Sequence, residues 1–121
     1  MTESGRNMEI KDCDIDGYSP LFSYNGWRVA VANACDRLKK ENLYRLERHL
    51  NTDEVFILLK GSATLHIGKE MSEYHLEIGK FYNVKRGEWH CISMEEGAKV
   101  AIIENDDTND DNSEKYFFKE K

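Results

Sequence analysis

The chain has 121 residues, of which 40% are hydrophobic and 11% aromatic, and we expect one globular domain over residues 1–121 with a single hydrophobic core. Its formal net charge of −6 at pH 7 argues against a nucleic-acid-binding protein, because such a protein presents a basic surface to the phosphates. No window reaches the roughly 18 apolar residues of a membrane-spanning helix, and Cys13, Cys35 and Cys91 form no Cys-x-x-Cys pair. We therefore expect a soluble, cytoplasmic protein with reduced cysteines that binds neither nucleic acid nor a membrane.

Short apolar runs that repeat every second residue, separated by Gly, Asn, Asp or charged turns, predict a mostly β protein. After an N-terminal arm of about residues 1–25, the candidate strands are Trp27–Ala34, Leu43–His49, Glu54–Lys60, Ala63–Ile67, Tyr74–Ile78, Phe81–Val84, Trp89–Met94 and Ala98–Ile103. Most joints are only a few residues long, as in antiparallel hairpins, and a tight turn is expected at Gly61. Only residues 33–42 are expected to hold a helical turn. Seven or eight such strands predict a sandwich or barrel.

The two ends of the chain are expected to lie against this barrel. An acidic loop and a C-terminal segment occupy about residues 105–121, and the low-complexity stretch 104–112 is expected to be a solvated loop. Residues 116–118 are all aromatic, so we expect them to pack on the barrel or on a second subunit, and Met8–Tyr24 to do likewise. Two exposed edge strands and this aromatic segment favour a homodimer.

Strand alternation predicts which side chains share a face. In the strand Leu43–His49, the side chains of Arg45, Glu47 and His49 point the same way. Glu54 begins the next strand, which is apolar on both faces beyond it. If the barrel brings these strands beside the one that follows Trp89, four side chains converge, with Arg45 on the same wall. The four are Glu47, His49, Glu54 and His90.

His90 shares its strand face with Ile92 and Met94, which predicts a partly desolvated imidazole that points to the interior. His66 and His75 are expected to be exposed instead, since His66 lies on a polar strand face and neither has an evident coordinating partner.

Two motifs in the chain resemble those of the cupin superfamily. The family's first motif contains His, three or four residues, Glu, six residues, Gly, and its second contains Gly, seven residues, Gly, two residues, His. These positions are matched by His49, Glu54, Gly61, Gly79, Gly87 and His90. The resemblance implies a small single-domain cupin, that is, an all-β, antiparallel double-stranded β-helix (jelly-roll) barrel that binds a metal or a small ligand within one end.

The chain departs from the family pattern at four positions. Glu41 stands at the first glycine, Glu47 at the first histidine, Lys85 at the proline and Met94 at the asparagine. The changes at Glu47 and Met94 weaken the implied metal assignment and favour a ligand set that has drifted.

The chemistry of such a site follows from its donors. Two neutral imidazoles and a carboxylate leave positions on a metal open for water, oxygen or substrate, and a second carboxylate favours Mn²⁺ or Fe²⁺. His49, Glu54 and His90 supply the first set and Glu47 the second carboxylate, with the divalent ion left open among Fe, Mn, Ni and Zn. Whichever of Glu47 and Glu54 is not a ligand is expected to move protons as a catalytic group. The expected substrate-binding residues are Arg45, Phe56 and Met94.

Two functions of different class stay open. One is a metal-dependent enzyme on a small polar or anionic metabolite, of the sugar isomerase, epimerase or dioxygenase type that the resemblance implies, with Arg45 holding a carboxylate or phosphate. The other is a non-catalytic ligand-binding or sensing barrel without metal. Structural interpretations also remain, namely Glu47 in a surface ion pair with Arg45 or Arg48, and His90 as a hydrogen-bonded core histidine.

Overall fold

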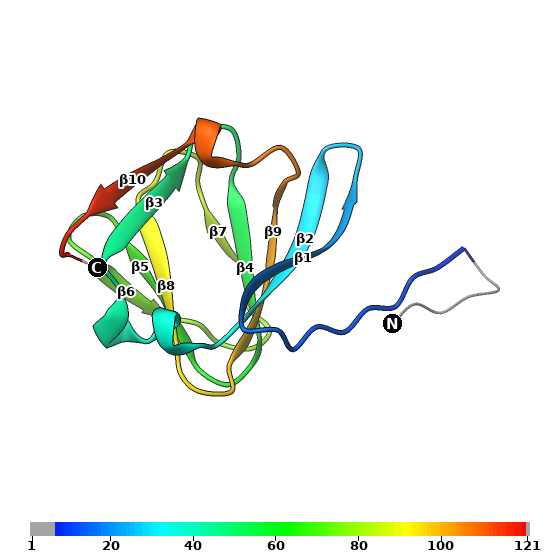
Figure 1. Ribbon diagram of the computed structural model, residues 1–121, viewed down its shortest axis with the longest axis horizontal. Coiled ribbons are helices and arrows are strands. Elements are labelled where there is room, and N and C mark those ends of the chain that lie inside the picture. Colours follow the sequence, from blue (N-terminus) through cyan, green and yellow to red (C-terminus); the bar gives the residue numbers. More distant parts are fainter. Residues whose placement is uncertain (1–6, 121) are drawn as a thin grey trace.

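The computed structural model describes residues 7–120, which form two five-stranded antiparallel sheets that face each other (Figure 1). The sheets have the strand orders β1-β2-β9-β4-β7 and β10-β3-β8-β5-β6. The strands are β1 (Gly17–Tyr24), β2 (Trp27–Asn33), β3 (Arg45–His49), β4 (Glu54–Lys60), β5 (Ala63–Ile67), β6 (Ser72–His75), β7 (Tyr82–Val84), β8 (His90–Met94), β9 (Lys99–Asn105) and β10 (Ser113–Phe117). This architecture confirms the predicted all-β, antiparallel double-stranded β-helix.

The hydrophobic core lies between the two sheets. Along β9, buried residues alternate with more exposed ones, so that Val100 and Ile102 point inward, as the two-residue period of a strand requires. In the facing sheet, Ala63 and Leu65 of β5 are buried in the same core. The same alternation decides which polar side chains, further along these strands, are directed into the barrel.

Strand β1 is a correction to the sequence analysis, which predicts only an arm there. Residues 17–24 pair antiparallel with β2 at the edge of the first sheet, and the pairing is interrupted by a bulge between Pro20 and Phe22. Proline lacks a backbone N–H and is confined to sheet edges and bulges, which weakens the strand pattern in the sequence. Residues 1–6 of the predicted arm lie outside the described residues. The strand carries Tyr18, which lines the cavity of the candidate site.

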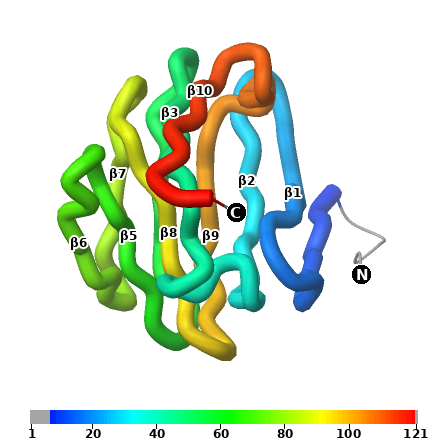
Figure 2. The backbone as a smooth tube through the Cα atoms, turned by 60° about the vertical axis from the view of Figure 1, so that its left-hand side comes forward, coloured from blue at the N-terminus to red at the C-terminus, as the bar shows by residue number. Residues whose placement is uncertain are grey.

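The predicted helical turn within residues 33–42 is present as two short 3₁₀ helices, η1 (Asp36–Leu38) and η2 (Lys40–Asn42). The C-terminal aromatic segment returns to the barrel: after η3 (Asp110–Asn112), β10 pairs with β3 and sets Tyr116 opposite Leu46. Figure 2 shows this segment running beside β3.

Two turns fix the register of the neighbouring strands. Gly61 adopts a φ of +79°, and a Cβ atom there would lie 2.7 Å from the Cα of Ala98, which confirms the predicted tight turn. At the next hairpin, the Met71 N–H donates to the carbonyl of Gly68 at 2.9 Å, and the β6 strand starts at residue 72 instead of the predicted 74. Within residues 7–120, no helix has the length and apolar character needed to cross a bilayer.

Candidate metal centre and its cavity

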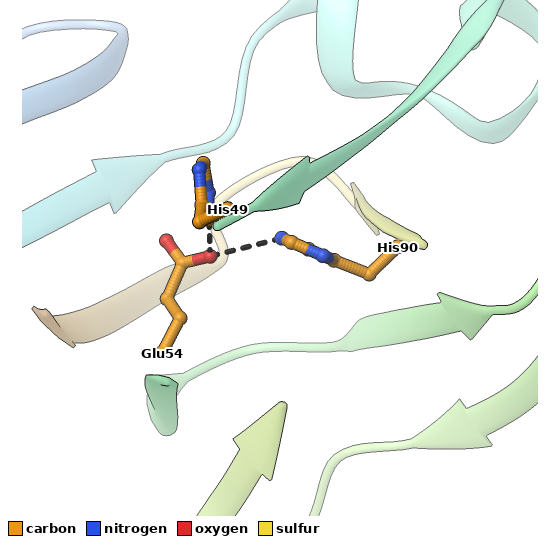
Figure 3. A group of neighbouring side chains, drawn as sticks. All are labelled: His49, Glu54 and His90. Carbon is orange, nitrogen blue, oxygen red and sulfur yellow. Dashed lines mark hydrogen bonds and ion pairs between the residues drawn. The ribbon is translucent and has the colours of Figure 1, made fainter. Parts of the chain in front are cut away.

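Three strands place two imidazoles and one carboxylate around a common point (Figure 3). His49 ends β3, Glu54 begins β4 and His90 begins β8. Ligand atoms of the three lie within 4.8 Å of one another. The Nε2 atom of His49 is 3.2 Å, and that of His90 2.9 Å, from the same Oε1 atom of Glu54. The structure thus brings together three of the four side chains whose convergence the strand alternation predicts.

The outer nitrogen of each imidazole is held by a hydrogen bond. His49 Nδ1 lies 2.8 Å from Ser113 Oγ, and His90 Nδ1 lies 3.0 Å from the carbonyl oxygen of Glu88. A carbonyl only accepts, so His90 Nδ1 carries a hydrogen and donates it. In a neutral ring the lone pair is then on Nε2, where it would face the Glu54 oxygen. A proton or a metal ion must therefore lie between Nε2 and this oxygen.

The pKa shifts agree with this geometry. Burial alone would raise the pKa of the Glu54 carboxyl, but hydrogen bonds from His49 and His90 outweigh it and hold the pKa below its usual range. Burial would lower the pKa of His90, but the hydrogen bond and the charge of Glu54 outweigh it and raise the pKa. Both directions favour an ionised Glu54 carboxylate in contact with a protonated His90 imidazole.

This donor set fits a divalent transition metal. Two imidazole nitrogens and a carboxylate are the ligands that Fe²⁺, Mn²⁺, Ni²⁺ and Zn²⁺ accept, and such a set leaves coordination positions for water or substrate. The hydrogen bonds on the Nδ1 atoms orient each ring with Nε2 toward the centre, as the outer partners of metal-bound histidines do. In the described part of the chain, no second group of three His, Cys, Asp or Glu side chains meets the same spacing.

The three side chains line a cavity of about 510 Å³ whose walls come from both sheets. Phe56 and Ile102 contribute apolar surface, and Arg45 and Glu47 contribute charge. The guanidinium of Arg45 lies 3.7 Å from the Glu47 carboxylate, and both side chains are about one third exposed, at 31% and 35%. The cavity is large enough for a small metabolite.

The predicted site residues do not all share one location. Arg45 and Phe56 line the cavity, and the Phe56 ring packs edge-on against His90 with ring centroids 6.0 Å apart. Glu47 also lines the cavity and is paired with His90 across β3 and β8, but it is not part of the group of three. Met94 is 2% exposed and belongs to the hydrophobic core, where it lies opposite Ala63 at the far end of β8. The structure therefore separates Met94 from the cavity.

The cavity wall also contains polar residues that are absent from the sequence prediction, among them Tyr18, Arg28 and Glu104. Arg28 and Glu104 pair across β2 and β9. A signal for them exists, because Arg28 is in phase with the buried Ala30, and Glu104 with the buried Ile102. Glu104 is only 6% exposed, and both Glu104 and Asn105 belong to β9, so the prediction that residues 104–112 form a solvated loop is wrong at its first two residues.

His66 corrects another prediction. It is 1% exposed, although a polar strand face suggested an exposed side chain. On the outer face of β5 and β8, the Lys40 ammonium group pairs with Glu73 at 2.5 Å, and both residues line a pocket together with His66. His66 Nε2 is hydrogen-bonded to Ser93 Oγ at 2.7 Å, and Nδ1 has no hydrogen-bond partner among the described residues. His75 is exposed, as predicted.

Comparison with known proteins identifies the fold. No family model and no curated protein matches the chain. Among solved structures, a cupin-2 domain protein from Shewanella frigidimarina is 21% identical, with a TM-score of 0.56 over 74% of this chain and 81% of that one. A 3,4-ketoisomerase from Helicobacter canadensis is 17% identical, with a TM-score of 0.57 over 72% and 66% of the two chains. KdgF from a Halomonas species is 10% identical, with a TM-score of 0.56 over 78% and 80%. The chain is therefore a small protein of the cupin fold.

Proposed function

We propose that this protein is a divalent-metal-dependent enzyme that acts on a small polar or anionic metabolite, with chemistry of the sugar isomerase or epimerase type. One observation carries the proposal: two Nε2 atoms point at one oxygen of Glu54, at 3.2 and 2.9 Å, while each Nδ1 atom has its own partner. That arrangement calls for a cation among three donors suited to a metal.

Each residue of the cavity has a role in this proposal. His49, Glu54 and His90 hold the metal, which when bound polarises a carbonyl or hydroxyl oxygen of the ligand. Arg45 binds a carboxylate or phosphate of the ligand, because a guanidinium pairs with both oxygens of such a group. Glu47, which lines the cavity outside the group of three, accepts and returns a proton.

The fold comparison is compatible with this class of reaction. A solved 3,4-ketoisomerase has the same fold as this chain, so the barrel can support an isomerisation. The likeness extends to the fold alone, and the assignment of this chain to an isomerase or epimerase rests on its own Glu47 and Arg45 beside the three metal-capable donors.

Metal analysis tests the proposal directly. Protein purified without chelator should contain Fe, Mn, Ni or Zn in stoichiometric amount, and His49→Ala and His90→Ala should each lose it. The matched control is His75→Ala, which removes an exposed histidine and should leave the metal content unchanged. If the folded wild-type protein binds no metal under saturating supply, the proposal fails and the non-catalytic binding barrel remains.

A second experiment tests the reaction type. The metal-loaded protein is incubated in D₂O with D-ribose 5-phosphate, D-glucose 6-phosphate or D-glucuronate, and proton NMR follows the hydrogen on the carbon beside the carbonyl. An isomerase or epimerase exchanges that hydrogen for deuterium, and Glu47→Gln should abolish the exchange while the metal content stays the same. Oxygen consumption by the Fe²⁺-loaded protein, without exchange, would point to a dioxygenase.

A further inference from the structure

A second polar centre lies in the same cavity and is built from three strands. The Tyr18 hydroxyl of β1 donates to Glu104 Oε2 of β9 at 2.6 Å, and Arg28 Nη2 of β2 donates to the same oxygen at 2.7 Å. The Glu104 carboxylate is buried, with a side chain only 4% exposed. All three residues line the cavity that contains the metal centre.

The centre leaves one acceptor and one donor unused. The hydrogen bonds from Tyr18 and Arg28 both go to Oε2 of Glu104, so neither uses Oε1. The Arg28 Nε–H is buried and lacks an acceptor within residues 7–120, although its Nη1 and Nη2 atoms reach the carbonyl oxygens of Asp106 and Thr108 at 3.3 and 3.4 Å. Buried polar groups in folded proteins nearly always have partners, so a ligand atom that accepts from the buried Arg28 Nε–H and donates to Glu104 Oε1 is a natural complement to this centre.

The chemistry of the ligand group follows from this pair. A hydroxyl group donates one hydrogen bond and accepts others, so it can serve both Glu104 Oε1 and Arg28 Nε–H. A carboxylate or phosphate would be repelled by Glu104, a ketone cannot donate, and an ammonium group cannot accept. Burial and the hydrogen bond to Glu104 raise the pKa of Tyr18, so its phenol keeps its proton and remains a donor to Oε2.

The second centre adjoins the first. Strands β4 and β9 are paired with Val55 opposite Ile103, and continuing this antiparallel register by one residue sets Glu54 opposite Glu104. Side chains opposite each other on one face of a sheet have Cβ atoms roughly 5 Å apart. A ligand oxygen at the metal centre and a hydroxyl at Glu104 can therefore belong to neighbouring carbons of one small molecule.

We infer that Glu104 and Arg28 bind a hydroxyl group of the ligand, with Tyr18 positioning Glu104, and that the substrate is accordingly a hydroxy-carbonyl compound such as a sugar acid. This inference rests on the proposed function, since it concerns the ligand of the same cavity. Glu104 contacts substrate, whereas Tyr18 acts through Glu104.

Two ring-shaped carboxylates of similar size test the inference. D-glucuronate carries hydroxyl groups, and cyclohexanecarboxylate carries none. Calorimetric titration of the Zn²⁺-loaded protein should show that D-glucuronate binds at least about tenfold more tightly than cyclohexanecarboxylate. This is the gain in affinity expected for a hydrogen bond to a charged group. Glu104→Gln should bring the ratio of the two affinities close to one; because both compounds are carboxylates, loss of the Glu104 charge affects them alike and leaves this ratio as the readout.

The control is Glu114→Gln, which alters an exposed carboxylate paired with Arg48 on β3 and should keep the wild-type ratio. Tyr18→Phe, which keeps the carboxylate, should lower the ratio partly, and it replaces Glu104→Gln if that variant does not fold. Equal affinities in the wild type, no measurable binding of either compound, or a wild-type ratio in folded Glu104→Gln or Tyr18→Phe overturns the inference.

Elemental analysis of the same samples separates this inference from the proposed function. Preference for D-glucuronate in protein that takes up no Zn²⁺ refutes the metal-dependent enzyme and keeps the hydroxyl site. Stoichiometric Zn²⁺ with equal affinities for the two compounds refutes the hydroxyl site and keeps the metal centre.

Discussion

Ser113 Oγ lies 2.8 Å from Nδ1 of His49, so a residue of the last strand orients an imidazole of the candidate metal centre. Ser113→Ala removes this hydrogen bond and leaves the three ligand side chains in place. We expect the affinity for Zn²⁺ to fall about tenfold, the lower end of the effect of outer partners on metal sites. Competition with a chromophoric chelator measures the Zn²⁺ affinity of the variant and of the wild type.

Ser93→Ala is the matched control for Ser113→Ala, because Ser93 is also hydrogen-bonded to a histidine, His66, at 2.7 Å. That variant should lower the thermal stability but retain the wild-type affinity for Zn²⁺. Equal losses of affinity in the two variants would show that any serine-to-alanine change in this sheet weakens the site.

Metal binding should also raise the melting temperature. An ion that binds only the folded protein stabilises it by about 2.7 kcal/mol at a free concentration of 100 times its Kd, and differential scanning calorimetry with and without Zn²⁺ should show the increase. EDTA should reverse it, and His90→Ala should show none of it. An equal increase in His90→Ala would place the ion elsewhere.

His66 should make the folded protein less stable in acid. Burial lowers the pKa of its imidazole, so the unfolded chain binds the proton more tightly than the folded chain. As the pH falls below the unfolded value of about 6.5, the free energy of unfolding should decrease, by up to about 1.4 kcal/mol per pH unit, until the folded pKa is reached. The groups that face His66 are Glu73, Lys40 and His75.

Urea unfolding between neutral and mildly acidic pH measures this dependence. His66→Gln should flatten the slope, whereas His75→Gln, a change at an exposed histidine, should preserve it. Parallel slopes for His66→Gln and the wild type would mean that other groups cause the loss of stability in acid.

Gly61 and Gly79 form a pair that separates backbone strain from steric collision. Both have positive φ, +79° and +95°, but a Cβ atom would meet the backbone of Ala98 at 2.7 Å only at Gly61, and would meet nothing within 4 Å at Gly79. Gly79→Ala should lower the free energy of unfolding by about 1 kcal/mol, and Gly61→Ala should lower it by clearly more. Urea unfolding of the two variants measures both losses of stability. A smaller loss for Gly61→Ala than for Gly79→Ala would contradict the close approach to Ala98.

The homodimer predicted from the sequence remains a prediction. Ile78 and Phe81, 68% and 74% exposed, lie between β6 and β7, and such apolar surface commonly marks a contact between subunits. Light scattering at micromolar concentration should give the mass of a dimer, and Phe81→Ser should shift it toward the monomer. A monomeric wild type would contradict the prediction.

The sequence predicted the barrel and the three metal-capable residues because both depend on the two-residue period of strands. His49 and His90 were expected on inward faces, and the structure places them beside Glu54. Alternation gives only relative faces, however, and does not say what covers an outer face. The buried His66 shares a pocket on the outer face with Lys40, a residue distant in the sequence that pairs with Glu73, and no local pattern contains this arrangement.

The second polar centre escaped prediction for two other reasons. The sequence pattern predicts a strand that ends at residue 103, which assigns Glu104 to the acidic stretch that follows it. Tyr18 lies on β1, where Pro20 and a bulge interrupt the pairing. Both residues acquire their role from partners more than 70 positions away, Tyr18 through Glu104 and Glu104 through Arg28.

The acidic bend after β9 is stabilised by hydrogen bonds from asparagine side chains. Asn51 donates to Asp107 Oδ1 at 2.6 Å, and Asn109 and Asn112 both donate to the Asp107 carbonyl, at 3.0 and 2.9 Å. Although its composition looks dispensable, this bend leads the chain into the strand that carries Ser113. Truncated versions of the protein should therefore retain this bend, the strand Ser113–Phe117, and Phe118 and Lys119, whose backbone N–H groups donate to the Tyr44 carbonyl. Affinity tags or fluorescent fusions belong beyond that point.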